Sequence, residues 1–68
     1  MEIKVNGRPT TLPQPQTLAE FLQSRQISVQ TRGVAVARNG CIAPRASWEN
    51  CKLEPGDQVE VIHAVAGG

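Results

Sequence analysis

Two Asn-Gly pairs, at positions 6–7 and 39–40, constrain the fold of this chain more than any other feature of its sequence. Asn-Gly favours the type I′ hairpin turn, because both central residues of that turn need a positive φ. The first pair predicts a hairpin between strands at residues 1–5, where apolar and polar residues alternate, and residues 8–12. Pro9 cannot donate to a ladder, so the second of these strands should lie at a sheet edge.

A single helix is predicted between the hairpins. Thr17 followed by Glu20 is the capping-box pattern, which satisfies two amide groups at the start of a helix. Leu18, Phe21 and Leu22 then repeat at the i, i+3, i+4 spacing, which places them on one stripe facing the sheet. The helix should be just over two turns long, so packing rather than intrinsic propensity must stabilise it.

The second hairpin follows a short apolar stretch. Ile27 and Val29 should cover the bottom of the core before strands at residues 34–38 and 41–43. Pro44 ends the latter strand, which again suits a sheet edge.

Two turns are predicted before the last strand. Residues 47–50 are a candidate short 3₁₀ or helical turn. Within it Trp48 is expected to be a packing anchor rather than a platform for a ligand, because large aromatic side chains dominate small cores. Residues 54–57 carry Pro and Gly at the central positions of a type II turn.

The final strand, residues 58–65, has the longest β pattern. If its first two valines point toward the helix, Ile62 and Ala64 point away and join Ala35 and Ala37 on the uncovered face of the sheet. An exposed apolar patch of this kind usually marks a contact site, although alanines can also simply fill a sheet face. The fold class is therefore α+β, with a mixed sheet of about five strands and one main helix on one face. The long connection through the helix permits parallel pairing of early and late strands, and the strand order stays open.

Length and composition exclude several classes of function. A single domain of 68 residues has no room for a deep substrate pocket, so a self-contained enzyme is not expected. Seven basic and six acidic side chains are scattered along the chain, unlike a nucleic-acid-binding surface. No apolar stretch is long enough for a signal peptide or a membrane span, which predicts a cytoplasmic protein with reduced thiols.

The residues that could bind a metal have the wrong spacing. Cys41, Cys51 and His63 could supply three ligands, but the nine-residue gap between the cysteines matches no common zinc pattern. No metal site is therefore predicted, and the cysteines are interpreted as small hydrophobes. Alternation places His63 on the helix-facing side, which favours a packed or turn-bonded histidine over a catalytic base.

The last two residues, Gly67 and Gly68, suggest where the chemistry lies. Glycines carry no Cβ and can pass through a slot too narrow for side chains, so the carboxylate of Gly68 should be accessible. It is ionised at neutral pH and could attack the α-phosphate of a nucleotide. We place a domain at residues 1–64 and a flexible tail at residues 65–68, with a frayed end of no function as the alternative.

The motifs that carry a family resemblance extend over nearly the entire chain: Val5-Asn6-Gly7, Thr17-Leu18, Val34-Ala35-Val36-Ala37, Pro44-Arg45 with Trp48, Gly56-Asp57-Gln58-Val59-Glu60-Val61 and Ala64-Val65-Ala66-Gly67-Gly68. Together they resemble the ubiquitin-like β-grasp sulfur carriers that end in Gly-Gly, and among these the ThiS group of thiamine thiazole biosynthesis. The turn at residues 39–41 departs from the pattern, because relatives often lack a cysteine there.

The resemblance implies a cycle in which Gly68 is the reactive residue. A ThiF-like adenylyltransferase would use ATP and magnesium to adenylate its carboxylate. Sulfur from a cysteine desulfurase would then give a thiocarboxylate, which a ThiG-like thiazole synthase would consume. The chain itself would be a protein cosubstrate, monomeric when free, with no bound cofactor, nucleic acid or membrane. Arg45 is either a rim contact for a partner or a solvated arginine. Partner contacts are expected at Ile62, Ala64, Val65 and Ala66.

Three other functions remain open at this stage. The small subunit of molybdopterin synthase resembles this chain in fold and tail, and only the Pro44-Arg45 and Trp48 block favours thiazole over pterin. A ubiquitin-like modifier would join Gly68 to lysines of target proteins. A plain binding module would have an incidental tail.

Overall fold

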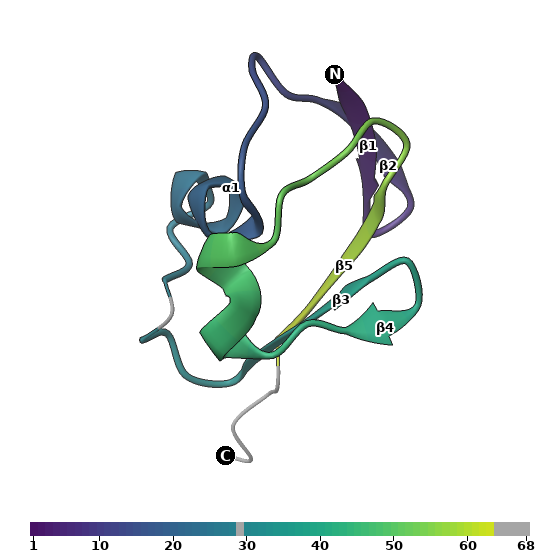
Figure 1. The fold of residues 1–68 in the computed structure, drawn as a ribbon. Coiled ribbons are helices and arrows are strands. Elements are labelled where there is room, and N and C mark those ends of the chain that lie inside the picture. Colours follow the sequence, from purple (N-terminus) through teal and green to yellow (C-terminus); the bar gives the residue numbers. More distant parts are fainter. Residues whose placement is uncertain (29, 64–68) are drawn as a thin grey trace.

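The computed structural model describes residues 1–28 and 30–63, which form a five-stranded sheet with two helical segments on one face (Figure 1). Val29 and residues 64–68 lie outside the described residues, and with them lie the end of the predicted last strand and the predicted tail. In chain order the elements are β1 (Glu2–Val5), β2 (Arg8–Thr11), α1 (Leu18–Ser24), β3 (Val34–Arg38), β4 (Cys41–Ile42), the 3₁₀ helix η1 (Arg45–Asn50) and β5 (Gln58–His63).

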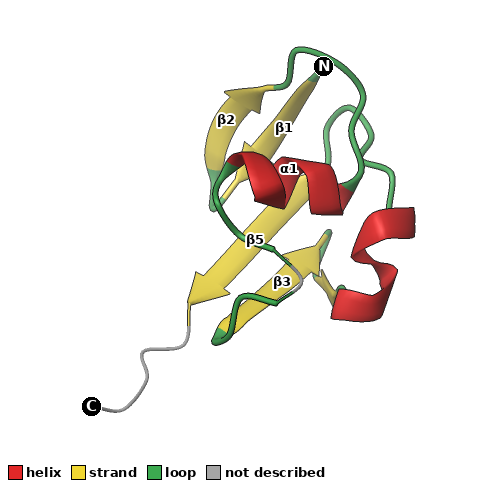
Figure 2. Cartoon of the chain, turned by 90° about the vertical axis from the view of Figure 1, so that its left-hand side faces the viewer, coloured by secondary structure: helices red, strands yellow, loops and turns green. Residues whose placement is uncertain are grey.

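The sheet has the order β2-β1-β5-β3-β4, which places β5 at its centre. β5 runs parallel to β1 and antiparallel to β3, and each hairpin partner is antiparallel. The long connection through α1 therefore does join parallel strands. Figure 2 shows α1 crossing one face of the sheet, with η1 beside it. The two strands that contain or precede a proline, β2 and β4, are the edges, as predicted.

Both Asn-Gly pairs form the predicted hairpin turns. Asn6 and Asn39 have φ values of 51° and 52°, and the following glycines have φ values of 81° and 84°. Positive φ at two successive residues is the requirement of a type I′ turn, and it matches the twist of the flanking strands. The type II turn at residues 54–57 is also confirmed, because Gly56 has φ 85° and the Asp57 amide donates to the Glu54 carbonyl at 3.1 Å.

The predicted capping box starts α1. The Glu20 amide donates to Thr17 Oγ1 at 3.2 Å, and the Thr17 amide donates to Glu20 Oε1 at 3.0 Å. The predicted apolar stripe, Leu18, Phe21 and Leu22, is buried against the sheet. This reciprocal cap and the packed stripe allow a seven-residue helix to form.

Trp48 is the packing anchor of the second half of the molecule. Its side chain is 1% exposed, and its indole Nε1 donates to the Ala43 carbonyl at 2.9 Å. The 3₁₀ helix that carries it begins at Arg45, two residues earlier than predicted. Ile27 is buried as expected, whereas Val29 lies outside the described residues.

Three predictions of burial are wrong. Alternation predicts an exposed Ala37 beside Ala35, but Ala37 is only 9% exposed. It lies in an interior strand between its register partners Ile42 and Glu60, whose longer side chains stand on the same face. His63 is exposed rather than packed, because it ends β5 beyond the stretch that pairs with β1. Cys41 is exposed on the edge strand β4 rather than buried as a small hydrophobe.

Candidate functional site

The candidate site is built on β5, because the predicted reactive tail follows this strand in the chain. It pairs with β1 at Gln58 and Val59 and with β3 from Val59 to His63. The predicted site residues after it lie outside the described residues, so their roles stay predictions: Ala64, Val65, Ala66, Gly67 and Gly68. Of the predicted partner contacts, the structure describes Ile62 alone.

The side chain of Asn6 extends the pairing of β5 beyond the end of β1. Its backbone amide donates to the Val59 carbonyl at 2.9 Å. Its side-chain Oδ1 accepts from the Val61 amide at 2.8 Å, and Nδ2 donates to the Val61 carbonyl at 3.4 Å. The Asn6 side chain thus bonds the backbone of β5 at Val61, where β1 has already ended and offers no further strand residue. This is the end of β5 from which the chain continues to Gly68. The Asn-Gly motif predicts the turn, but it gives no indication of this second role.

Asn39 makes the equivalent contact at the other end of β5. Its backbone amide donates to the Gln58 carbonyl at 2.7 Å, and its Oδ1 accepts from the Gln58 amide at 2.9 Å. Its Nδ2 also donates to Asp57 Oδ1 at 3.1 Å. The two hairpin asparagines therefore hold β5 from opposite sides and at opposite ends.

Asp57 is a buried carboxylate that ties the start of β5 to β3. It is 6% exposed, and its Oδ2 accepts from Arg38 Nε at 2.8 Å and from the Glu54 amide at 2.8 Å. Burial alone would raise the pKa of Asp57, but the hydrogen bonds from Glu54, Asn39 and Arg38, with the Arg38 charge, hold the pKa below its ordinary value. A buried and hydrogen-bonded carboxylate of this kind holds the start of β5 against β3.

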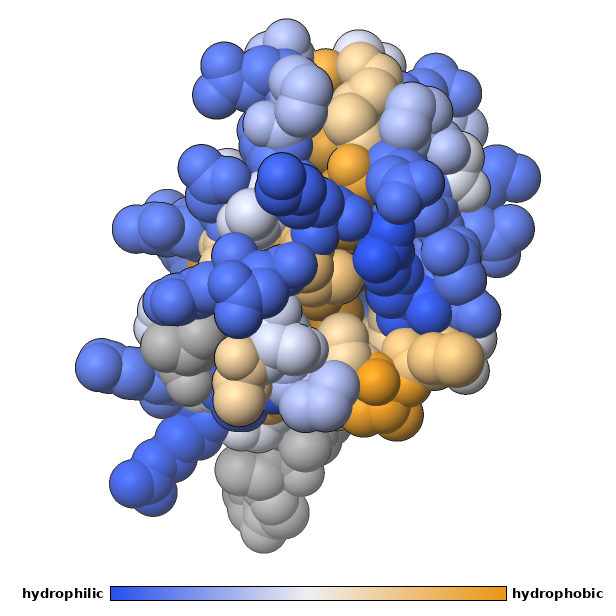
Figure 3. Space-filling model, viewed as in Figure 1, coloured by the Kyte–Doolittle hydropathy of each residue, from blue (hydrophilic) through white to orange (hydrophobic). Residues whose placement is uncertain are grey.

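The face of the sheet that the helices leave uncovered has an apolar half and a polar half. The exposed large hydrophobic side chains among the described residues are Ile62, 50% exposed, and Ile42, 68% exposed. Ala35 is exposed and is the register partner of Ile62. Figure 3 shows the strongest hydrophobic colour of its view at the lower right, over the β4 end of the sheet. Alternation and register place Glu2, Lys4 and Thr11 on the other half of this face.

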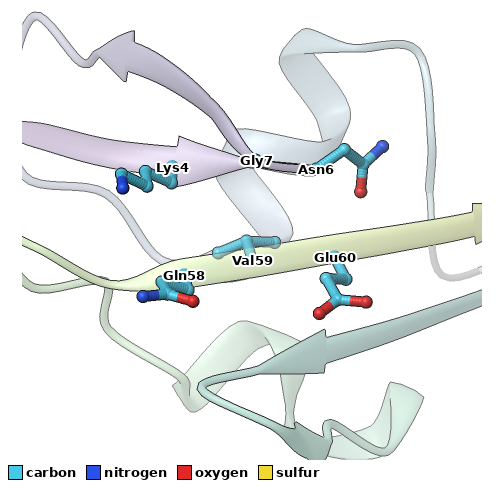
Figure 4. Close-up of a pocket in the computed structure, with 6 residues that line it drawn as sticks. All are labelled: Lys4, Asn6, Gly7, Gln58, Val59 and Glu60. Atoms are coloured by element: carbon cyan, nitrogen blue, oxygen red, sulfur yellow. The ribbon is translucent and has the colours of Figure 1, made fainter.

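A shallow hollow lies where β1 and β5 separate. It has a volume of about 420 Å³, and Figure 4 shows the residues that line it: Lys4, Asn6, Gly7, Gln58, Val59 and Glu60. Its charged residues, Lys4 and Glu60, are exposed. It is a surface depression rather than an enclosed substrate pocket.

Arg45 has a structural role that the sequence reading missed. Its guanidinium lies over the Trp48 ring at 5.2 Å from the centroid, and its Nη2 donates to the Val34 carbonyl at 2.9 Å. The interpretation as a solvated arginine is therefore wrong. The Pro44-Arg45 and Trp48 block joins η1 to the start of β3, opposite the last residue of β5.

Neither cysteine lies in a metal-binding cluster within the described ranges. Both thiols are free, and no group of three or more His, Cys, Asp or Glu residues in residues 1–28 and 30–63 could hold a metal ion. Cys51 is half-buried against the core, and its Sγ lies 3.5 Å from Arg38 Nη1. In the part of the chain that the structure describes, neither helix has the length and apolar character needed to cross a membrane.

Comparison with known proteins decides the family. The model of the ThiS family matches residues 3–68 of this chain. The chain belongs to the ThiS family. The sulfur carrier protein ThiS of Escherichia coli (strain K12) is 32% identical over 68 residues, which is the full length of both proteins. The crystal structure of a thiamine biosynthesis protein (ThiS) from Geobacter metallireducens superposes with a TM-score of 0.83 and 28% identity, over all of both chains. The predicted family and the ubiquitin-like β-grasp fold are therefore confirmed.

Two longer ThiS-related sequences are named as thiazole synthases. The protein from Magnetococcus marinus is 32% identical over 68 residues, and the one from Paramagnetospirillum magneticum is 29% identical over 68 residues. This chain spans 20% of the length of each of these proteins. The similarity is thus confined to one part of each.

Proposed function

We propose that this ThiS-family chain carries sulfur for the synthesis of the thiazole of thiamine, as a thiocarboxylate on Gly68. The full-length similarity to a sulfur carrier protein carries the proposal. The small fold supports it, because the described residues form a sheet whose strand β5 is held at both ends by asparagine side chains. The hollow on that sheet is a surface depression and not an enclosed pocket. The chain supplies a carboxylate and a surface, and its partners supply the catalysis.

The proposed chemistry needs three transfers at one carboxyl group. An oxygen of the Gly68 carboxylate attacks the α-phosphate of ATP, pyrophosphate leaves, and an acyl-adenylate forms. The outer sulfur of a partner persulfide then attacks the acyl carbon and displaces AMP. A second thiol reduces the resulting acyl disulfide, which leaves the thiocarboxylate on Gly68 and a disulfide on the partner. ATP and magnesium belong to the activating enzyme, so the carrier holds no cofactor of its own.

The partners follow from these transfers and from the later use of the thiocarboxylate. They are an adenylating enzyme similar to ThiF, a cysteine desulfurase acting indirectly, and a thiazole synthase similar to ThiG. The carrier-like segment within two proteins named as thiazole synthases supports the last of these. We place this cycle in the cytoplasm, a reducing compartment in which both thiols would stay free.

The apolar half of the open face is the proposed docking surface for the adenylating enzyme. Ile62 is half exposed at the end of β5, beside the small Ala35, so a partner can bury it without moving the sheet. Ile62→Glu should raise the KM for the carrier more than tenfold, because a buried unpaired carboxylate opposes docking. Thr11→Glu is the matched control: Thr11 is exposed on the edge strand β2, at the polar half of the same face. Equal KM values for the two variants would contradict docking at Ile62.

Blocking the terminus tests the function directly. A variant with alanine appended after Gly68 should be neither adenylated nor able to support thiazole formation, provided that mass spectrometry shows the extra residue is not trimmed. A carrier fails when Gly68 is deleted, whereas an adaptor keeps working. Isopeptide-linked adducts on other proteins, in place of a thiocarboxylate, would replace the proposal with a protein modifier.

A further inference from the structure

A cleft lies on the helix-covered side of the sheet, at the end of β5 from which the chain continues to Gly68. It has a volume of about 260 Å³ and is lined by Val5, Asn6, Arg25, Ile27, Val61 and His63. Val5 and Ile27 are each 7% exposed, and Val61 is half-buried, so the floor is apolar. Arg25 and His63 are exposed at its margin. The cleft is separate from the open-face patch at Ile62, because it lies on the other side of the sheet.

Positive charge gathers around this cleft. Arg25 follows the last turn of α1, and its guanidinium lies 5.2 Å from the centroid of the Phe21 ring. Arg32 lies two residues before Val34 in the chain. Val34 is the register partner of His63, so Arg32 is close to the same end of β5. Neither arginine forms an ion pair with a carboxylate within residues 1–28 and 30–63. We call these two residues the arginine collar. Arg45 donates to the Val34 carbonyl and so adds a third positive charge near the His63 end of β5.

Most carboxylates lie away from the collar. Glu2, Glu54 and Asp57 meet at the opposite end of β5, where the Gly56 amide donates to the Glu2 carbonyl and the Asp57 amide to the Glu54 carbonyl. Glu20 is in the first turn of α1, at the other end of the helix from Arg25. At that end the carboxylates have a cationic partner, because Arg38 pairs with Asp57 and Glu54, whereas the two collar arginines have no carboxylate partner among the described residues.

Chain geometry brings every partner to this end of the molecule. The five residues after His63 span at most about 18 Å even when fully extended. An enzyme that acts on the Gly68 carboxylate must therefore approach the collar closely. This reach is nearly twice the screening length of about 10 Å at 0.1 M salt, so charges on the two surfaces interact only where docking brings them closer together than the full length of the tail.

We propose that the arginine collar and its cleft form a second docking surface for the adenylating enzyme, which presents an acidic rim around the opening of its active site. An apolar side chain of that rim fills the cleft over Val5 and Ile27, and a neighbouring carboxylate pairs with Arg25. The inference rests on the proposed function and adds the chemistry of the partner's surface to it. Charge complementarity of this kind sets the association rate and the orientation of docking.

The test compares charge reversals at two ends of α1. Arg25→Glu changes the collar, whereas Lys52→Glu makes the same change in net charge on an exposed residue whose backbone pairs with Thr17, at the start of the helix. The assay is ATP–pyrophosphate exchange with the ThiF-like adenylyltransferase of the same organism, at about 0.1 M and about 0.5 M salt, where the screening lengths are about 10 Å and about 4 Å. Thermal unfolding of both variants checks that they are folded, and Arg25→Gln provides a neutral substitution at the same site.

Arg25→Glu should raise the KM for the carrier about tenfold at the lower salt concentration and less than about threefold at the higher one. The KM for ATP should not change. Arg25→Gln should give an intermediate value, and Arg25→Lys and Lys52→Glu should stay within about twofold of the parent chain. Equal effects of Arg25→Glu and Lys52→Glu would overturn the proposal, as would a change in the KM for ATP. If the parent chain itself is not adenylated, the proposed function fails first, and this inference fails with it.

Discussion

Replacing Asn6 by glycine should loosen the end of β5 without straining the hairpin. The φ of 51° at Asn6 is accessible to glycine, so this change removes the side-chain contacts and keeps the turn. The Val61 amide loses an acceptor at 2.8 Å, and the Val61 carbonyl loses a weaker donor at 3.4 Å. One net hydrogen bond is worth about 1 kcal/mol, and the flexibility of glycine in the unfolded chain adds up to about 1 kcal/mol. Asn6→Ala loses the same hydrogen bond and carries about 1–2 kcal/mol of left-handed strain in place of the cost of glycine flexibility, so it should be the less stable variant by up to about 1 kcal/mol.

Amide hydrogen exchange separates the local effect from the global one. In Asn6→Gly the Val61 amide should exchange about fivefold faster than expected from the change in global stability, since about 1 kcal/mol corresponds to about a fivefold change in an opening equilibrium. Asn39→Gly is the matched control, because Asn39 has the same turn geometry and holds the Gln58 amide at 2.9 Å. There the excess exchange should appear at Gln58 and not at Val61.

A uniform increase in the exchange rates of all amides would refute this reasoning. If Val61 and the core amide of Val36 accelerate by the same factor in Asn6→Gly, the Asn6 side chain does not hold the end of β5. An alanine variant more stable than the glycine variant would refute the assigned backbone strain.

Three further predictions follow from the buried groups and the open face. Because the pKa of Asp57 is held below its ordinary value, its ionised form contributes stability that is present above about pH 4 and is lost as the pH falls through the lower folded-state pKa. Asp57→Asn should therefore lower the free energy of unfolding by about 1–3 kcal/mol at pH 7. In urea unfolding at a series of pH values, the stability of this variant should fall less steeply below about pH 4 than that of the parent chain, and an equally steep fall would contradict this. Trp48→Ala should cost about 3–5 kcal/mol in thermal or urea unfolding, which is a large part of the stability of so small a domain, and a loss below about 1 kcal/mol would contradict its role as an anchor. Ile62→Glu should change the free energy of unfolding by less than about 0.5 kcal/mol while it impairs adenylation, and a collapse of the fold would show that Ile62 is a core residue instead.

Local signals in the sequence predicted most of the fold. The two Asn-Gly turns, the Thr17–Glu20 capping box and the turn around Gly56 each depend on residues close together in the chain, and all four are confirmed. The edge positions of β2 and β4 followed from prolines, which act through their own backbone. The family resemblance was confirmed because its motifs extend over nearly the entire chain.

Features that depend on distant contacts were not predicted. Periodicity shows which way a side chain points but not how long its neighbours are, so the burial of Ala37 between Ile42 and Glu60 was missed. The exposure of His63 depends on where β1 ends. Asn6 and Val61 are 55 residues apart, and only the strand order brings them together. The site residues 64–68 lie outside the described residues and stay predictions.

Intact-mass measurement of the protein isolated from cells, with fragmentation to locate the change, tests the central claim most directly. We predict a species in which one oxygen is exchanged for one sulfur, localised to Gly68. A species that instead gains a whole sulfur atom, localised to Cys41 or Cys51, would be a persulfide. It would show that a thiol rather than the terminal carboxylate carries the sulfur.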